Sequence, residues 1–365
     1  MPVAEPQWQA AVLPLMRGRS WHRAATGALS VVAALLLVSC SGERTESQAP
    51  GPRVYVTNEN SGDLTIIDAG ARQVVGRVPL GKRPRGIVPS PDGRLLYIAL
   101  SGSPIAGPGV DESTLPPADK AADGIAVFDV AAGRILRVLR GISDPESVAV
   151  SPDGARLYVA SEDTGQLVVL DARNGRMLGQ LAVGGEPEGV GVSPDGRFVL
   201  ATSEEDHTAA VIDTANLRLL GRVEVGERPR SILFVGDRAF VPGENDASLT
   251  AIDPAAGRAV GRLTIGGDGA RPMGLAAASG GIFLTTGRGG ELVRIDPARL
   301  QVTGRVRVGE RPWGVAATPD GRFLFTANGP SNDVTMVDAR SMQVVARFPA
   351  GDRPWGVAVL PPSTS

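Results

Sequence analysis

Seven side chains that each follow a repeated proline combine the residue types found in binding sites. In chain order they are Arg85, Glu146, Glu188, Arg230, Met273, Trp313 and Trp355. Four successive repeats therefore supply two arginines and two glutamates, and the other three supply an apolar and aromatic set. Large aromatic side chains beside a few convergent polar groups are typical of ligand pockets and interface anchors. If one fold gathers these positions, the chemistry on offer is binding of a small ligand or a partner protein.

The prolines belong to a unit that is written seven times along the chain. A second marker of this unit is an aspartate that closes an apolar run, at Asp68, Asp129, Asp171, Asp213, Asp253, Asp296 and Asp338. The spacings between these aspartates are 61, 42, 42, 40, 43 and 42 residues. Each unit is predicted to form four short β-strands, because β-branched runs alternate with turn sequences such as Pro-Asp-Gly. Four strands in about 40–45 residues is the spacing of a β-propeller blade.

The sequence therefore predicts an all-β, seven-bladed β-propeller with four-stranded blades over residues 53–360. The first predicted strand, 54–58, is the second strand of a blade, and the last, 355–360, is a first strand. We expect these two to pair, so that the C-terminal strand completes the N-terminal blade and closes the ring. In such a ring the seven post-proline residues surround one mouth of the central channel. The aspartates are expected to bond turn amides rather than to act in catalysis.

Two interpretations of this ring of side chains are open. In one, the ring binds a small ligand or partner. In the other, Arg85 pairs with Glu146 and Glu188 with Arg230 across neighbouring blades, while Trp313 and Trp355 plug the channel. The residues before the prolines suggest a repeated structural contact to acidic loop residues such as Glu59, Glu162 and Glu244; they are Arg83, Asp144, Glu186, Arg228, Arg271, Arg311 and Arg353.

The repeat sequence also carries a family resemblance. The stretch VYVTNENSGDLTIIDAGARQVVGRVPLGKRPRGIVPSPDGRLLYIAL resembles the YVTN-repeat β-propellers, and the ordered RPRG, DPES, EPEG, RPRS, RPMG, RPWG, RPWG series with TANGPSNDV resembles the bacterial group associated with PQQ-dependent catabolism. This resemblance implies an extracytoplasmic propeller, accessory to quinoprotein alcohol oxidation or to associated transport. It supplies no catalytic residues. The long first insertion, 101–123, departs from the group, and it is predicted to lie on the mouth face. Three interpretations of it are open: a lid, a loop that docks a partner, or a loop that has lengthened without a function.

The N-terminal segment is typical of a lipoprotein leader. Arg17, Arg19 and Arg23 precede an apolar run over 24–38 that ends in Leu-Val-Ser-Cys, which resembles the lipobox of bacterial lipoproteins. The resemblance implies a signal peptide over 1–39, a lipidated Cys40, a flexible tether over 40–52 and a short tail over 361–365. Met16 is an alternative start. We expect a membrane-anchored protein of the cell envelope that faces the periplasm or exterior; the alternative is a buried cysteine ending an uncleaved anchor.

Composition excludes several other functions. With 37 Lys and Arg against 39 Asp and Glu, the chain has no electrostatic reason to bind nucleic acid. One cysteine and two histidines exclude disulfides and cysteine-rich metal centres, and no haem-attaching CxxCH is present. We predict a monomer without a resident cofactor, and PQQ is not expected to bind this chain. A role in electron transfer beside a quinoprotein dehydrogenase would therefore act through partnership alone.

The binding role is favoured over an enzymatic alternative. Lactonases and a lyase for cyclic peptide antibiotics use seven-bladed propellers, and that resemblance rests on fold alone. It would require His207, or the acidic loop residues Glu204, Glu205 and Asp206, with a divalent metal. A solvated loop is the simpler interpretation of this stretch, because the EF-hand spacing is absent.

Overall fold

The computed structural model describes residues 51–105 and 114–362, in which every strand belongs to a four-stranded antiparallel sheet. The predicted leader, Cys40 and most of the tether lie outside the described residues. Three sheets, from the channel outward, are β28 (Pro354–Leu360), β1 (Arg53–Asn58), β2 (Asp63–Asp68), β3 (Gln73–Pro79); β4 (Pro84–Pro89), β5 (Leu95–Leu100), β6 (Gly124–Asp129), β7 (Arg134–Leu139); and β8 (Pro145–Val150), β9 (Arg156–Ser161), β10 (Gln166–Asp171), β11 (Met177–Ala182).

The other four sheets follow the same order. They are β12 (Pro187–Val192), β13 (Phe198–Ser203), β14 (Thr208–Asp213), β15 (Arg218–Glu224); β16 (Leu233–Val235), β17 (Arg238–Gly243), β18 (Ser248–Asp253), β19 (Arg258–Thr264); β20 (Leu275–Ala278), β21 (Gly281–Thr285), β22 (Glu291–Asp296), β23 (Gln301–Arg307); and β24 (Pro312–Ala317), β25 (Phe323–Asn328), β26 (Asp333–Asp338), β27 (Gln343–Pro349). Two 3₁₀ turns, η2 (Glu162–Thr164) and η3 (Gly287–Gly289), interrupt loops. No helix in the described part of the chain has the length and apolar character that a membrane span requires.

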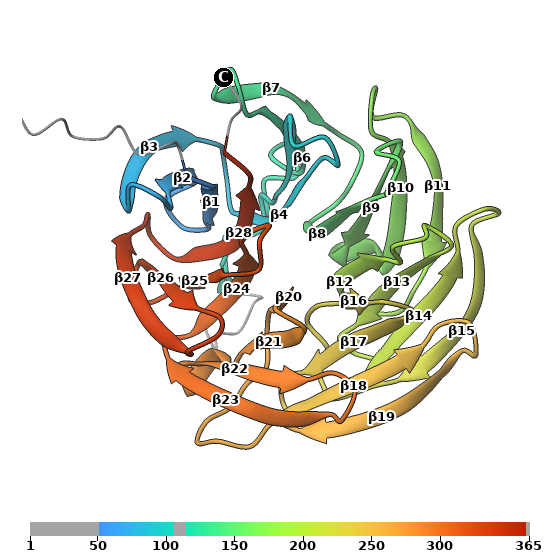
Figure 1. The fold of residues 1–365 in the computed structure, drawn as a ribbon. Helices are drawn as coiled ribbons and strands as arrows, with labels where there is room; N and C mark the ends of the chain where they lie inside the picture. The colour runs from blue at the N-terminus through green and yellow to red at the C-terminus, as the bar shows by residue number, and fades with distance from the viewer. Residues whose placement is uncertain (1–50, 106–113, 363–365) are drawn as a thin grey trace, which may run out of the picture. The chain divides into compact units, whose positions relative to one another are not determined.

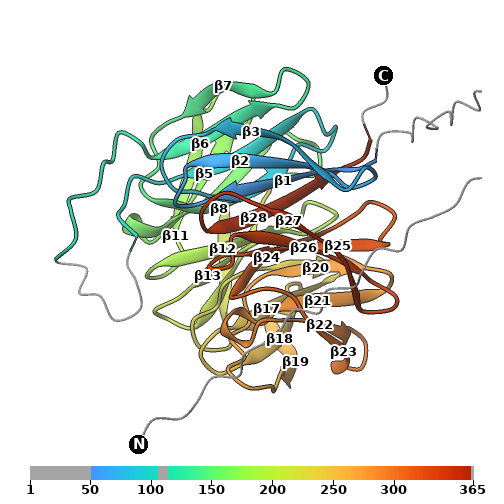
Figure 2. The same ribbon diagram turned by 90° about the vertical axis from the view of Figure 1, so that its left-hand side faces the viewer.

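The seven sheets are the blades of a closed ring, as the sequence predicted (Figure 1). The first strand of each blade contacts the first strand of the next blade around the centre. In ring order these strands are β4, β8, β12, β16, β20, β24 and β28. Closure occurs where β28 pairs antiparallel with β1, with Val54 opposite Val359 and Tyr55 opposite Ala358. The side view shows the blades edge-on, with the described parts of the segment between β5 and β6, 101–105 and 114–123, on one face of the ring (Figure 2). The predicted fold and its mode of closure are confirmed.

The core lies between adjacent blades rather than inside any one of them. One apolar cluster, for example, joins Tyr55 and Leu64 of one blade to Leu96, Ile98 and Phe128 of the next. Each sheet thus buries both faces against its neighbours, which supplies the apolar burial that a single blade lacks. At the outer turns, the repeated aspartates accept backbone N–H bonds as predicted; for example, Asp68 accepts from Ala71 at 2.8 Å.

Glycine sets how closely the first strands approach one another at the mouth. A Cβ added to Gly314 would lie 2.5 Å from the carbonyl oxygen of Trp355, and one added to Gly356 would lie 2.5 Å from that of Arg85. Both obstacles are backbone atoms, which cannot move aside as a side chain can. Where the repeat has Ser231 instead, the hydroxyl donates to the carbonyl of Met273 at 2.6 Å, so its side chain forms a hydrogen bond with the neighbouring blade.

This close approach is tested by Gly314→Ala, with Gly221→Ala in β15 as the matched control. The first change places a Cβ against backbone, whereas the second meets nothing within 4 Å. We expect Gly314→Ala to lower the free energy of unfolding by about 1–3 kcal/mol, and Gly221→Ala to change it by less than about 0.5 kcal/mol. Urea unfolding measures both. Equal stability of the two variants would contradict the proposed constraint.

Candidate binding site at the channel mouth

The seven post-proline side chains meet where two cavities adjoin. A polar basin of about 860 Å³ opens at the mouth, and an axial cavity of about 340 Å³ with largely apolar walls runs below it between the first strands. Four of the seven residues line both cavities: Glu188, Arg230, Trp313 and Trp355. Arg85 and Glu146 line only the basin, and Met273 lines only the axial cavity. The ring therefore forms the boundary between a wet entrance and a narrow apolar interior.

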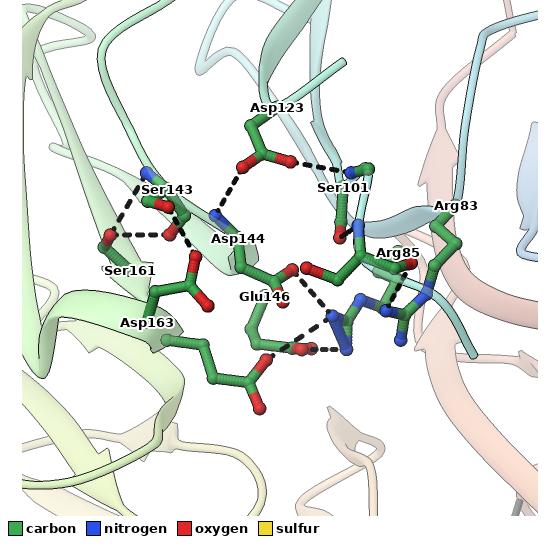
Figure 3. Close-up of polar contacts among 12 residues, drawn as sticks. Arg83, Arg85, Ser101, Asp123, Ser143, Asp144, Glu146, Ser161 and Asp163 are labelled. Carbon is green, nitrogen blue, oxygen red and sulfur yellow. Dashed lines mark hydrogen bonds and ion pairs between the residues drawn. The ribbon is translucent and has the colours of Figure 1, made fainter. Parts of the chain in front are cut away.

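The first polar cluster of the ring is centred on Arg85 (Figure 3). Its guanidinium pairs with Glu146 of the neighbouring blade, and its Nη2 lies 3.2 Å from Oδ1 of Asp144 and 3.6 Å from Oε2 of Glu162. The Glu146 side chain is only 1% exposed, so its charge has little access to water. The pairing of Arg85 with Glu146 across blades, one of the two interpretations of the sequence, is confirmed, although two further carboxylates share the arginine.

The second polar cluster repeats this arrangement around Arg230. The guanidinium pairs with Glu188 of the neighbouring blade and lies 2.8 Å from Oε2 of Glu204 and 2.7 Å from Oε2 of Glu244. Arg228 contacts Glu204 and Glu244 from the outer side. As in the first cluster, the cross-blade pair predicted from the sequence forms. Glu204 and Glu244, from loops between second and third strands, are the other acidic groups that contact Arg230.

Burial raises the pKa of one carboxyl in each cluster. It raises the pKa of Glu204 to about 8 against the opposing effect of Arg230, and it raises the pKa of Glu162 against that of Arg85. For Glu244 and Asp144 burial acts in the same upward direction, but the adjacent Arg230 and Arg85 prevail and lower the pKa of each carboxyl. At neutral pH the Arg230 cluster therefore holds a proton on Glu204, which limits its excess of negative charge.

The Arg85 cluster also has the spacing of a metal site. Ligand oxygens of Asp144, Glu146 and Glu162 all lie within 4.8 Å of one another, the one such acidic group found among the described residues. Each of the three carboxylates is in ion-pair contact with Arg85. The guanidinium thus places one positive charge among the three acids, and all three already have an ion-pair partner without a metal.

The other side of the ring is aromatic. The rings of Trp313 and Trp355 stack with centroids 5.7 Å apart and an interplanar angle of 25°. The guanidinium carbon of Arg311 lies 4.7 Å from the centroid of the Trp313 ring, a cation–π contact. Both tryptophans are half-buried and border both cavities, whereas Met273 is only 3% exposed. The tryptophans therefore present aromatic surface to the basin, and Met273 lies deeper, against the axial cavity.

The residues before the prolines have a backbone role that the sequence did not reveal. All except Arg271 adopt a left-handed backbone conformation, with φ between 39° and 57°. Except at Arg83, the carbonyl groups of these residues accept N–H bonds from the loop between the second and third strands; for example, Asp144 accepts from Glu162 at 3.0 Å. The side-chain contact that the sequence suggested also forms at Arg83, whose Nη2 lies 3.1 Å from Oε1 of Glu59. No sequence feature indicated this left-handed conformation, because glycine, the usual marker of positive φ, is absent from these positions.

The described ends of the insertion, 101–105 and 114–123, border the basin. Arg83 donates to the carbonyl oxygens of Ser103 and Pro104 at 2.9 and 3.2 Å. The Asp123 carboxylate accepts from the backbone N–H groups of Gly102 and Asp144 at 2.6 and 3.0 Å, which ties both ends of the insertion to the Arg85 cluster (Figure 3). The insertion is therefore fixed to the mouth at its base.

The residues of the enzymatic alternative do not converge. Glu204 turns into the Arg230 cluster, while Glu205 and Asp206 are exposed. Neither described cavity is lined by His207, whose Nδ1 accepts the backbone N–H of Arg228 at 3.3 Å. Among the described residues, Glu204, Glu205, Asp206 and His207 form no group with metal-ligand spacing.

Comparison with known proteins supports the fold. A family model described as the cytochrome D1 heme domain matches residues 118–230, which is less than half of the chain. Hydrazine synthase of Kuenenia stuttgartiensis is similar in structure, with a TM-score of 0.67 and 20% identity over 82% of this chain and 99% of that chain. Dihydro-heme d1 dehydrogenase NirN, solved in complex with DHE, has a TM-score of 0.61 and 18% identity over 84% of this chain and 74% of that chain.

A putative 6-phosphogluconolactonase of Bacteroides uniformis is also similar in structure, with a TM-score of 0.68 and 16% identity over 85% of this chain and all of that chain. No match was found among curated proteins. Sequence identities this low show a shared propeller fold and leave activity open.

The protonation of Glu204 gives stability a pH dependence. In the folded state this carboxyl has a pKa of about 8, against a usual value of 4.5, so the folded state binds the extra proton between those values. Its contribution to stability is present below pH 4.5 and is lost as pH rises through 8, by at most about 1.4 kcal/mol per pH unit. We expect Glu204→Gln, which mimics the protonated acid, to lose less stability than the wild type between pH 5 and 9.

Urea unfolding at several pH values measures this difference. Glu205→Gln, on the same loop but exposed, is the matched control and should follow the wild type. Parallel curves for Glu204→Gln and the wild type would show that Glu204 is ionised at neutral pH.

Proposed function

We propose that this propeller is a binding protein that takes a small ligand at the channel mouth. The observation that supports this best is the Trp313–Trp355 stack, which borders a basin of about 860 Å³ on one side and an apolar axial cavity on the other. The polar clusters around Arg85 and Arg230 hold the opposite side of the ring in fixed positions. Rigid aromatic surface beside fixed charges is the arrangement that small-ligand sites share.

A binding role agrees better with the described residues than catalysis does. The lactonase or lyase alternative would need His207, or Glu204, Glu205 and Asp206, beside a divalent metal; of these four residues only Glu205 lines the basin, and among the described residues they form no group with metal-ligand spacing. The structural similarity to a putative lactonase supports the shared fold and gives no support to a shared activity. We therefore propose a non-enzymatic protein that acts as a monomer, without nucleic acid.

The partial match to the cytochrome D1 heme domain raises the question of haem, whose iron is held by His, Cys, Met or Tyr. The residues do not fit this ligation. His207 does not line the basin, Met273 faces the axial cavity, and the described tyrosines are buried in the apolar core: Tyr55, Tyr97 and Tyr158. We propose no haem chemistry for this chain and, as the sequence suggested, no resident PQQ.

The biological setting that we propose follows from the sequence resemblance. The YVTN-like repeats and the ordered RPRG-to-RPWG series favour an extracytoplasmic protein accessory to PQQ-dependent alcohol oxidation or to associated transport. The ligand would then be a small molecule of that metabolism, with an extracytoplasmic protein as the alternative partner.

We also propose that the chain is anchored to the cell envelope through a lipid on Cys40, the only cysteine in the sequence. In a bacterial host, Cys40→Ser should move the full chain from the membrane fraction to the soluble fraction and abolish incorporation of radiolabelled palmitate. Ser41→Ala, the adjacent change, should leave both unaffected. A Cys40→Ser protein that stays in the membrane would instead indicate the uncleaved anchor.

The binding role is tested by a thermal-shift screen of the full chain against small aromatic and aliphatic acids, alcohols and amines. A ligand that binds only the folded state raises the melting temperature by mass action. We expect at least one compound to stabilise the wild type and the control Val75→Ala, an exposed outer-strand change, but not Trp313→Ala or Trp355→Ala. If no stabilisation depends on either tryptophan, the proposed function is wrong.

A further inference from the structure

We infer that the ligand of this mouth is an aromatic carboxylate, whose carboxylate is bound by Arg311 and Arg353 and whose ring lies against the Trp313–Trp355 pair. This inference rests on the proposed function and specifies its ligand class. It comes from the arginines of the basin, which differ in what they contact.

Six arginines line the basin, and four of them are matched by carboxylates. Arg83 pairs with Glu59, Arg228 with Glu204 and Glu244, and Arg85 and Arg230 each have three carboxylate partners; the other two are Arg311 and Arg353. Within the described residues, neither Arg311 nor Arg353 forms an ion pair. A partly buried guanidinium without an anion leaves its strongest hydrogen-bonding capacity unused.

The two unmatched arginines occupy equivalent positions on adjacent blades. Arg311 precedes the first strand β24 and Arg353 precedes β28, and these two strands are neighbours in the ring. Burial lowers the pKa of Arg311; the Glu244 carboxylate acts to raise it, and the charges of Arg288, Arg353 and Arg230 act to lower it. Three arginines thus act on Arg311 against one acid, a local excess of positive charge that an anion placed between the Arg311 and Arg353 guanidiniums would relieve.

The aromatic requirement comes from what lies beside these guanidiniums. Arg311 stacks on Trp313, which in turn stacks on Trp355, so a cation and two indole rings form one column at the edge of the basin. Because both indoles also line the basin, a planar ring attached to the bound carboxylate meets aromatic surface. Such contacts favour a flat, apolar ligand body over an aliphatic one.

The opposite side of the basin sets where a charged ligand lies. Around Arg85, three carboxyl groups face one guanidinium, and the exposed Glu205 adds another acid to the lining. An anion is repelled there and attracted to the side of Arg311 and Arg353, which form no ion pair with any described residue. A cationic ligand would bind the other way round, away from the tryptophans. The basin thus separates the two charge types by position.

The experiment uses isothermal titration calorimetry on the full chain with naphthalene-2-carboxylate as the probe. Three comparison compounds each change one feature of the probe. 2-Naphthalenemethanol removes the negative charge, 2-naphthylmethylamine reverses it, and cyclohexanecarboxylate removes the aromatic ring. We expect naphthalene-2-carboxylate to bind at least tenfold more tightly than each of them. Arg311→Gln and Arg353→Gln should each weaken its binding about tenfold, and Trp355→Leu should weaken it while leaving cyclohexanecarboxylate unchanged.

Arg271→Gln is the matched control. Arg271 occupies the same repeat position, contacts Asn245 and does not line the basin, so this variant should bind the probe within twofold of the wild type. Unchanged melting temperatures show that each variant is folded.

The inference is overturned if the alcohol or amine binds as tightly as the carboxylate, if Arg353→Gln binds normally, or if naphthalene-2-carboxylate does not bind at all. Tryptophan-dependent binding of an amine or alcohol in the thermal-shift screen would preserve the binding role and reject only the carboxylate class. Failure of both experiments rejects both proposals.

Discussion

The structure depends on how closely the backbones of adjacent first strands approach at the mouth. Gly314 and Gly356 leave no room for a Cβ because the carbonyl of the next blade lies in that space. The residue between the proline and this glycine is therefore held at the channel, whatever its side chain. Five of the seven repeats have this glycine and the other two have serine, and all seven first strands line the same channel, so the chain can place arginine, glutamate, methionine or tryptophan around one opening without changing the ring. Function in this architecture is a choice of side chains at positions that packing has already fixed.

The repeat spacing was enough to predict the blades, their number, the closure by β28 and β1, and the shared location of the seven ring residues. It also suggested the pairing of Arg85 with Glu146 and of Glu188 with Arg230. The sequence pointed to Glu162 and Glu244 as partners of the residues before the prolines, but it did not predict that they and Glu204 also reach Arg85 and Arg230, because the path of their loops depends on left-handed residues that no glycine marks. The stack of the two tryptophans depends on side-chain rotation, which residue spacing does not encode.

Charge divides the mouth into two unlike halves. On one side, Arg85 and Arg230 are each enclosed by three carboxyl groups, and burial raises the pKa of one of these, Glu204, to about 8. Buried ion clusters of this kind contribute little net stability, but they hold their members in one geometry. On the other side, Arg311 and Arg353 keep their charge available beside aromatic surface. The charged groups of the first half are held by one another, whereas Arg311 and Arg353 in the second half form no ion pair with any described residue.

The position of Trp355 on β28 links recognition to completion of the chain. This strand is the last of the ring to be synthesised, and it both seals the sheet begun by β1 and supplies the second indole of the stack. During synthesis, the other first strands precede Trp355, so the indole stack cannot form until the last strand is made. A prematurely ended or clipped polypeptide that lacks β28 would lose the seal of the ring and one of the two stacked indoles together.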